Sequence, residues 1–231
     1  MRINKYLALK QHSTRRGADE LIKNGQVLIN GRPAVLGDKV EESDKVEVRF
    51  KGKQKPIDYV YYAYNKPRGI VTHSSQYGDT EIKHVVNIPG VFPMGRLDKD
   101  STGLIILTND GRITERLLSP EYEHDKEYLV TTKDKLRGNF KQKMEEGVQI
   151  EREKTKPAEI EIINDHTFKV ILTEGKKHQI RRMCSALFQD VDDLKRIRIM
   201  NIELGNLGSG KTREIVGDEL KTFLKSLGIQ S

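Results

Sequence analysis

The chain has 231 residues, of which 35% are hydrophobic and 32% charged, so the composition predicts an ionic surface around a core of limited size. No apolar run approaches the roughly 20 residues of a membrane-spanning helix, and Met1–Lys5 leads into no signal-peptide segment, so we expect a cytoplasmic protein without a membrane partner. The net charge is +7, and the lone cysteine, Cys184, excludes an internal disulfide and a multi-thiolate metal site.

The first 50 residues predict a small unit of two helices and a short sheet. Apolar residues at helical spacing predict two short helices within residues 2–24. Alternation then changes to a period of two around Val27–Ile29 and Val46–Phe50, which predicts strands. Asn30-Gly31 is a strong signal for a hairpin turn, because both residue types tolerate positive φ.

Positive charge is concentrated in this N-terminal unit. Residues 1–55 hold 13 basic and 7 acidic side chains, a net charge of +6, which leaves +1 for the remaining chain. Clustered Lys and Arg displace counterions from phosphates, so the segment is typical of a polyanion-binding module. A merely solubilising surface is the alternative that composition leaves open.

Residues 51–58 are polar, contain Pro and Gly and lack periodicity, so we place a linker there. Beyond it we predict strands at Tyr59–Asn65, Gly69–Thr72, Leu104–Thr108, Glu127–Thr132, Ile160–Ile163 and Thr167–Thr173. We predict helices at Arg112–Leu118, Arg137–Glu146, Lys176–Phe188 and from Gly217 onward. The fold class is α+β, with a small module at residues 1–55 and a second domain of mixed, mainly antiparallel sheet with flanking helices at residues 56–231.

A charged loop precedes the apolar strand Leu104–Thr108. It reads Gly95-Arg96-Leu97-Asp98-Lys-Asp-Ser-Thr-Gly103. An arginine beside a carboxylate at a strand end lowers the pKa of that carboxylate and keeps it ionised as a nucleophile or base, which makes Asp98 a candidate reactive group. A turn with solvated charges is the alternative.

A second basic cluster, Lys176–Arg182, begins a helix whose other face is apolar. Cations at a helix N-terminus oppose the helix dipole, so their presence favours phosphate or carboxylate partners. The alternative is a solvated helix face.

Gly205–Thr212 matches the phosphate-binding pattern of P-loop nucleotide hydrolases at every fixed position. Only 19 residues follow Thr212, too few for the later strands of such a fold. We therefore predict a Gly-rich connection from the last strand to a C-terminal helix. The six histidines are scattered without the spacing of a metal site, and we expect no metal and no cofactor.

Four motifs in order resemble those of the ribosomal RNA pseudouridine synthases of the RsuA/Rlu type. They are Asn65–Gly69, the run from Gly95 to Gly111, Lys126–Tyr128 and Gly175–Cys184. Residues 2–50 resemble the S4 RNA-binding domain that precedes the catalytic domain in those enzymes. Within the family, Arg196–Asn201 and Glu123–Tyr128 look closest to the branch of large-subunit pseudouridine synthase F.

The resemblance implies an isomerase that detaches a uridine base from C1′ of its ribose, rotates it and rejoins it through C5. It implies that Asp98 is essential, as a nucleophile or a base at the sugar, and that Arg181 pairs with this carboxylate. By the same resemblance Tyr128 stacks on the target base and assists removal of the C5 proton, and Arg96 fills the space that the flipped nucleotide leaves.

The expected partner is ribosomal RNA, with 23S favoured over 16S or transfer RNA, and we expect a monomer. We expect phosphate and RNA-shape contacts from basic residues of both domains: Arg2, Lys5, Arg15, Arg16, Lys23, Arg32, Lys177 and Arg182. A non-catalytic S4-type RNA-binding protein and a P-loop nucleotide hydrolase are the competing functions. These motifs do not identify which uridine is modified.

Overall fold

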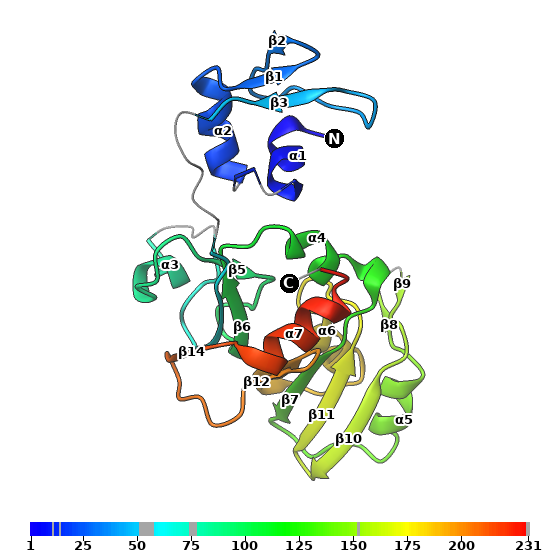
Figure 1. Ribbon diagram of the computed structural model, residues 1–231. Coiled ribbons are helices and arrows are strands. Elements are labelled where there is room, and N and C mark those ends of the chain that lie inside the picture. The colour runs from blue at the N-terminus through cyan, green and yellow to red at the C-terminus, as the bar shows by residue number, and fades with distance from the viewer. Residues whose placement is uncertain (11, 14, 51–57, 74–77, 152, 230–231) are drawn as a thin grey trace.

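The computed structural model describes residues 1–10, 12–13, 15–50, 58–73, 78–151 and 153–229. A small N-terminal unit stands apart from a larger unit that is built around one sheet (Figure 1). Almost all of the predicted linker at 51–58 lies outside the described residues, so the division at residue 55 stays a prediction. Within the described part of the chain, no helix is long and apolar enough to cross a membrane.

The N-terminal unit contains the two helices and the short sheet that the sequence predicts. Its elements are α1 Ile3–Leu9, α2 Arg15–Lys23, β1 Val27–Ile29, β2 Arg32–Pro33 and β3 Val46–Val48, with antiparallel strand order β2-β1-β3. The hairpin turn is confirmed, since Asn30 and Gly31 have φ of 50° and 82°. Ile3, Leu7 and Ile22 are buried against β1, which gives the unit a core of its own.

The larger unit is built around a nine-stranded sheet with the main order β10-β11-β7-β12-β6-β4-β14. Its strands are β4 Tyr61–Lys66, β5 Phe92–Met94, β6 Thr102–Thr108, β7 Lys126–Thr132, β10 Glu159–Asn164, β11 Thr167–Leu172, β12 Val191–Ile199, β13 Ile202–Glu203 and β14 Thr212–Glu214. In the described residues its strands pair antiparallel except for the parallel pair β6 and β12. The predicted mixed, mainly antiparallel sheet is confirmed.

Helices cover both faces of this sheet. They are α3 Ile82–Val85, α4 Ile113–Leu118, a 3-10 turn Pro120–Tyr122, α5 Phe140–Glu145, α6 Gln179–Ala186 and α7 Gly217–Ser226, and a small hairpin is formed by β8 Gln149–Ile150 and β9 Glu153–Lys154. Successive side chains of a strand point to opposite faces. Accordingly Ile105 and Leu107 of β6 pack in one core with α5 and α6, while Leu104 and Ile106 pack in the other with α4 and α7.

Gly69–Thr72 and β12 differ most from the prediction, and the structure also adds α3, β5, the β8–β9 hairpin and β14. Gly69–Thr72 is not a strand: Gly69 has a φ of 86°, and Val71 makes only an isolated bridge to Glu81. The central strand β12 was not predicted. Its pairing with β7 shifts register twice, at Val191/Asp193 and at Arg196/Arg198, so bulges interrupt the alternation that marks a strand in the sequence.

Candidate active site

Asp98 lies on the loop between β5 and β6, and this loop is fixed on both sides of it. The buried Leu97 donates its N–H to Thr72 Oγ1 at 3.0 Å and accepts from the same hydroxyl at 2.8 Å. Ser101 N donates to Asp98 O at 3.1 Å and closes a turn. The Asp98 side chain is 34% exposed, so its carboxylate is accessible on an otherwise anchored loop.

A buried lysine lies beneath this loop. Lys66 is fully buried at the end of β4, and its Nζ donates to the carbonyls of Pro67 at 2.9 Å, Ile70 at 2.7 Å and Lys99 at 3.4 Å. Burial lowers the pKa of Lys66 to about 8, and the charges of Asp100 and Asp98 act in the opposite direction. Lys66 therefore ties the turn after β4 to the Asp98 loop.

The side chain that contacts the Asp98 carboxylate is that of His178, and not that of the predicted partner, Arg181. His178 Nδ1 lies 3.1 Å from Asp98 Oδ2. Arg181 donates to the carbonyl oxygens of Val191 at 3.2 Å and Asp100 at 3.5 Å, and no ion pair joins it to Asp98 in the described part of the chain. The physical reason is the position of His178 one turn earlier, where its φ of 52° ends the loop at the N-cap of α6.

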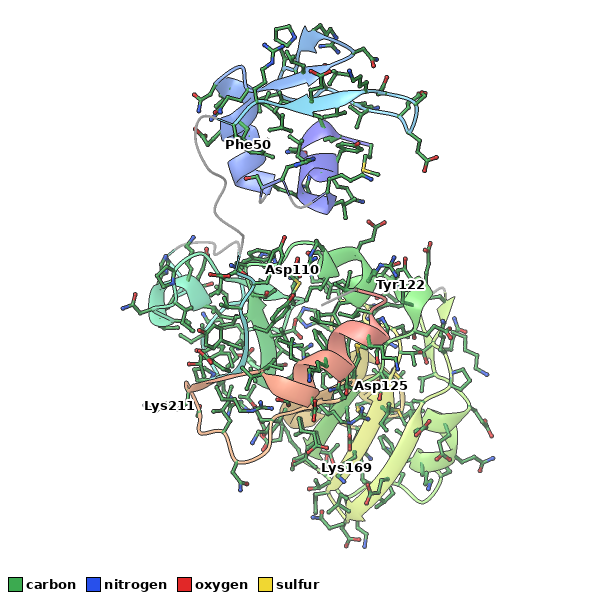
Figure 2. All side chains as sticks on the ribbon, viewed as in Figure 1. Phe50, Asp110, Tyr122, Asp125, Lys169 and Lys211 are labelled. Carbon is green, nitrogen blue, oxygen red and sulfur yellow. The ribbon has the colours of Figure 1, made fainter. Side chains whose placement is uncertain are left out.

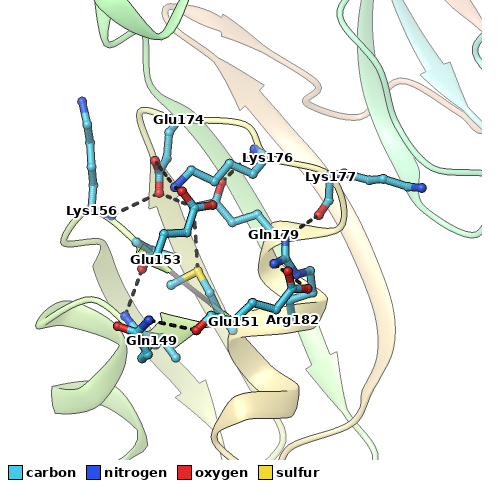
Figure 3. A network of polar contacts seen from close by, with 12 residues as sticks. Gln149, Glu151, Glu153, Lys156, Glu174, Lys176, Lys177, Gln179 and Arg182 are labelled. Atoms are coloured by element: carbon cyan, nitrogen blue, oxygen red, sulfur yellow. Dashed lines mark hydrogen bonds and ion pairs between the residues drawn. The ribbon is translucent and has the colours of Figure 1, made fainter.

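A polar network holds the loop that carries Lys177 and His178 (Figure 3). The buried Glu174 accepts from Gln179 Nε2 at 2.5 Å and from Lys156 N at 3.1 Å, and Gln179 Oε1 accepts from Lys176 N at 2.9 Å. The bonds of Gln179 to Glu174 and Lys176 join the two ends of the segment 174–179. The segment therefore presents Lys177 and His178 toward the Asp98 loop.

Figure 3 also shows two cations of the basic cluster held by the β8–β9 hairpin. Lys176 Nζ lies 2.9 Å from Glu153 Oε2, and Arg182 Nη2 lies 2.9 Å from Glu151 Oε1. Arg182, a predicted RNA-binding residue, therefore has an internal carboxylate partner. An RNA phosphate would compete with Glu151, which is 77% exposed.

Tyr128 and two cations face the loop from the sheet. Tyr128 is 9% exposed on β7, and Arg196 lies opposite it on β12 with its Cζ 6.0 Å from the ring centroid. Arg196 is 3% exposed and donates to Leu104 O at 2.7 Å and Arg96 O at 3.4 Å. Lys126 lies two residues before Tyr128 on β7, and its Nζ donates to His124 O at 2.8 Å.

The approach of β6 to β12 at this point requires glycine. Gly103 has a φ of 102°, and a Cβ built there would lie 2.2 Å from Arg196 O. No side chain fits in that space. Gly103, at the end of the Asp98 loop, thus lets the loop approach the strand that carries Arg196.

These residues surround one cavity of about 750 Å³. Four of the predicted site residues line it, namely Asp98, Tyr128, Arg96 and Lys177, together with Lys126, His178 and Arg196. The volume falls within the roughly 300–1,000 Å³ of ordinary ligand sites. Arg181 and Arg182 are not among the lining residues.

The sequence reasoning missed four polar residues of this site: Lys66, Lys126, His178 and Arg196. Each lies inside or beside a motif already singled out, but the inward direction of a charged side chain depends on strand pairing. A lysine at the end of a strand that begins with four apolar or aromatic residues, Tyr61–Tyr64, was the clearest available signal for Lys66.

The described residues contain no group of three or more His, Cys, Asp or Glu side chains that could hold a metal ion. Cys184 is fully buried, and burial raises the pKa of its thiol to about 12, so it lacks the thiolate that a nucleophile needs. It packs in the core between α6 and the sheet.

Most of the predicted RNA-binding residues of the N-terminal unit lie on its two helices and on β2, and Arg2 directly precedes α1. Arg2 and Arg15 are exposed, and the side chain of Arg16 lies outside the description. Three others contact carboxylates: Lys23 contacts Glu20 at 3.1 Å, Arg32 contacts Asp38 at 2.8 Å, and Lys5 contacts Glu115 of the larger unit at 2.5 Å.

The P-loop pattern Gly205–Thr212 does not form a phosphate-binding turn between a strand and a helix. It connects β13 to β14, so a strand follows it directly, and α7 starts later at Gly217. Lys211 lies on the exposed part of this loop (Figure 2). The predicted direct connection to the C-terminal helix is corrected by the intervening β14, which pairs with β4.

Residues 60–186 match the family model described as RNA pseudouridylate synthase, and residues 1–46 match the S4 domain. The chain is 39% identical to the dual-specificity RNA pseudouridine synthase RluF of Salmonella typhi, over 97% of this chain and 78% of that protein. It is 35% identical to the ribosomal large subunit pseudouridine synthase B of Bacillus subtilis, over 95% of this chain and 94% of that protein.

It is also 35% identical to the ribosomal small subunit pseudouridine synthase A of Pasteurella multocida, over 97% of this chain and all of that protein. Among solved structures, a crystal structure of a pseudouridylate synthase superposes with a TM-score of 0.71 at 31% identity. The superposition covers 98% of this chain and 99% of that one.

Proposed function

This chain belongs to the RNA pseudouridylate synthase family and is a pseudouridine synthase of ribosomal RNA, and from that premise we propose that it isomerises a uridine of 23S ribosomal RNA as a monomer. The expected family resemblance is confirmed, with the S4 domain in front. The observation that supports the proposed chemistry most directly is that Asp98 and Tyr128 line the same cavity.

In this proposal the target uridine leaves its stack and enters the cavity, because its base must be free to rotate. The Asp98 carboxylate acts at the ribose while the anchored loop fixes its position. The ring of Tyr128 stacks on the uracil, and its phenol assists removal of the C5 proton. Arg96 is exposed at the cavity and fills the space that the flipped nucleotide leaves.

His178 extends the set of residues that act on Asp98. Its contact at 3.1 Å orients the carboxylate in the RNA-free protein. Arg181 donates to Asp100 O, two residues from Asp98, and we propose that it acts on Asp98 through this backbone contact. Lys177 and the exposed Arg2 and Arg15 bind RNA phosphates, and Arg182 does so in competition with Glu151.

The test is tritium release from transcripts labelled with 5-tritiated uridine, because only chemistry at C5 releases this label. We expect release from 23S transcripts up to one equivalent per RNA and none from 16S or transfer RNA transcripts. Release from 16S or transfer RNA alone would contradict the 23S assignment. Light scattering of the purified chain should give 26.5 kDa, and a mass of twice that value would contradict the monomer.

A further inference from the structure

Two cations form part of the floor of the cavity, beside the tyrosine that stacks on the base. Lys126 and Tyr128 are two residues apart on β7, so their side chains share one face of the strand. Arg196 is the cross-strand neighbour of Tyr128 on β12. All three residues line the cavity.

Neither cation has a carboxylate contact within the described part of the chain. Arg196 and Lys126 donate to backbone carbonyls, and Arg196 Nη2 is buried without a hydrogen-bond partner among the described residues. Burial and the charge of Arg196 lower the pKa of Lys126, and Asp125 acts in the opposite direction. A buried arginine near a half-buried lysine costs free energy unless an anion completes the site.

We propose that Lys126 and Arg196 stabilise the uracil ring as an anion when its bond to the ribose breaks. The proposal rests on the proposed function, because it needs a uridine in this cavity. It adds to Asp98 and Tyr128 two groups that act on the leaving base rather than on the sugar.

The chemistry generates this anion whichever role Asp98 has. Whether the carboxylate adds to C1′ or removes a proton from C2′, the N1–C1′ bond breaks and its electron pair stays on the uracil ring. The charge is shared between N1 and the two carbonyl oxygens. Rotation then brings C5 to C1′. The C5–C1′ bond forms as the Asp98–C1′ ester bond breaks or, in the elimination route, as the proton that Asp98 removed returns to C2′. The C5 proton then leaves and N1 takes up a proton, so the isomerisation balances without an oxidant or a reductant.

The geometry suits a preorganised electrostatic role. The guanidinium of Arg196 is fixed by Leu104 O and Arg96 O, at opposite ends of the Asp98 loop, and lies over the ring of Tyr128. A cation fixed in a site of low dielectric constant stabilises developing negative charge without reorganising during the reaction. The ammonium of Lys126 lies on the same face of β7 as the stacking ring.

The experiment compares uridine with 5-fluorouridine at the target position of the RNA. Fluorine at C5 withdraws electrons and stabilises the uracil anion. The modified substrate therefore depends less on the two cations for stabilisation of the negative charge. The variants are Lys126→Met and Arg196→Lys. The rate is the single-turnover loss of the target nucleoside, measured by nuclease digestion and mass spectrometry coupled to chromatography.

We expect Lys126→Met, which removes a charge, to react about 100-fold more slowly than the wild type with uridine but only about 10-fold more slowly with 5-fluorouridine. Arg196→Lys keeps a charge but loses the contacts that fix the guanidinium, so we expect losses of about 10-fold with uridine and about threefold with 5-fluorouridine. RNA binding should change less than about threefold. The matched controls are Lys169→Met on β11 and Arg198→Lys on β12, neither of which lines the cavity. Each control should react at the wild-type rate with both substrates.

An equal loss of rate with both substrates would overturn the proposal, because it would show that Lys126 and Arg196 only maintain the shape of the site. A wild-type protein that converts neither substrate would instead contradict the proposed function. Melting temperatures of both variants, measured in parallel, identify any that fail to fold, and Arg196→Lys keeps the charge if Lys126→Met is unstable.

Discussion

The N-terminal unit and the cavity beside Asp98 use positive charge in opposite ways. In the N-terminal unit, Arg2 precedes α1 and Arg15 begins α2, and both are exposed, so bulk salt screens them. In the cavity and beneath its loop, Lys66 and Arg196 are buried and held by backbone carbonyls. Exposed cations bind RNA through phosphates, and the strength of this binding falls as the salt concentration rises. Buried cations act on atoms at fixed positions, and the strength of their interactions depends little on the salt concentration.

The largest effect is expected from a variant that separates the aromatic ring of Tyr128 from its hydroxyl group. Tyr128→Phe keeps the stacking ring and removes the phenol, so we expect C5 tritium release to fall at least about 100-fold with little change in RNA affinity. Tyr122→Phe, on the surface of the larger unit (Figure 2), is the matched control and should keep the wild-type rate. Undiminished release by Tyr128→Phe would contradict a role for the phenol.

The next effect concerns the close approach that fixes Arg196. Gly103→Ala places a methyl group 2.2 Å from Arg196 O at a φ of 102°, and we expect a loss of roughly 3 kcal/mol or more in unfolding free energy. For a chain of this size the melting temperature should fall by about 6–12 °C. Gly138→Ala, with no atom within 4 Å of its added Cβ, should melt within about 2 °C of the wild type. Equal melting temperatures for both variants would contradict the close approach.

A smaller effect is expected from the exposed cations. The double change Arg2→Gln and Arg15→Gln should weaken RNA binding about tenfold at low salt and make the slope of log K against log salt less negative by about 1.4. Bound RNA should still react at the wild-type rate. Lys221→Gln with Lys225→Gln on α7 removes the same charge elsewhere on the surface. A slower reaction of bound RNA in the Arg2/Arg15 variant would contradict the view that these residues act in RNA binding alone.

The smallest effect is a pH dependence at Lys66. The pKa of this residue is about 8 in the folded chain and close to its ordinary 10.5 when unfolded, so between these values the unfolded state binds more protons. Stability of the wild type relative to Lys66→Met should therefore rise with pH through this window. Thermal unfolding of both proteins at pH 7.5 and 9.5 measures the difference, and a relative stability that falls over this range would contradict the buried cation.

The sequence predicts best where structure follows from local periodicity. The apolar face of the segment Lys176–Phe188 predicted α6, and Asn30-Gly31 predicted the hairpin turn. The same reasoning missed β12, because its bulges interrupt the alternation of Leu194 and its neighbours. It could not identify Tyr128 and Arg196 as cross-strand neighbours, since they lie far apart in the sequence and only strand register brings them together.

The partner of Asp98 shows the same limit. The family motif indicated Arg181, but the left-handed conformation of His178 at the start of α6 brings its imidazole to the carboxylate instead. Such a conformation in a non-glycine residue depends on the surrounding contacts, here the Glu174–Gln179 bond that closes the loop. The motif therefore identified the loop that carries Asp98, whereas the contact between His178 and Asp98 could be identified only in the structure.

The central claim is that the catalytic carboxylate and the RNA-holding surface are separate. The most direct test is to measure tritium release and RNA affinity together for Asp98→Asn and the wild type on the same 23S fragment. The account predicts no detectable release by Asp98→Asn, with an RNA affinity within about threefold of the wild type because exposed cations supply most of the binding free energy. Continued release by the variant would contradict it.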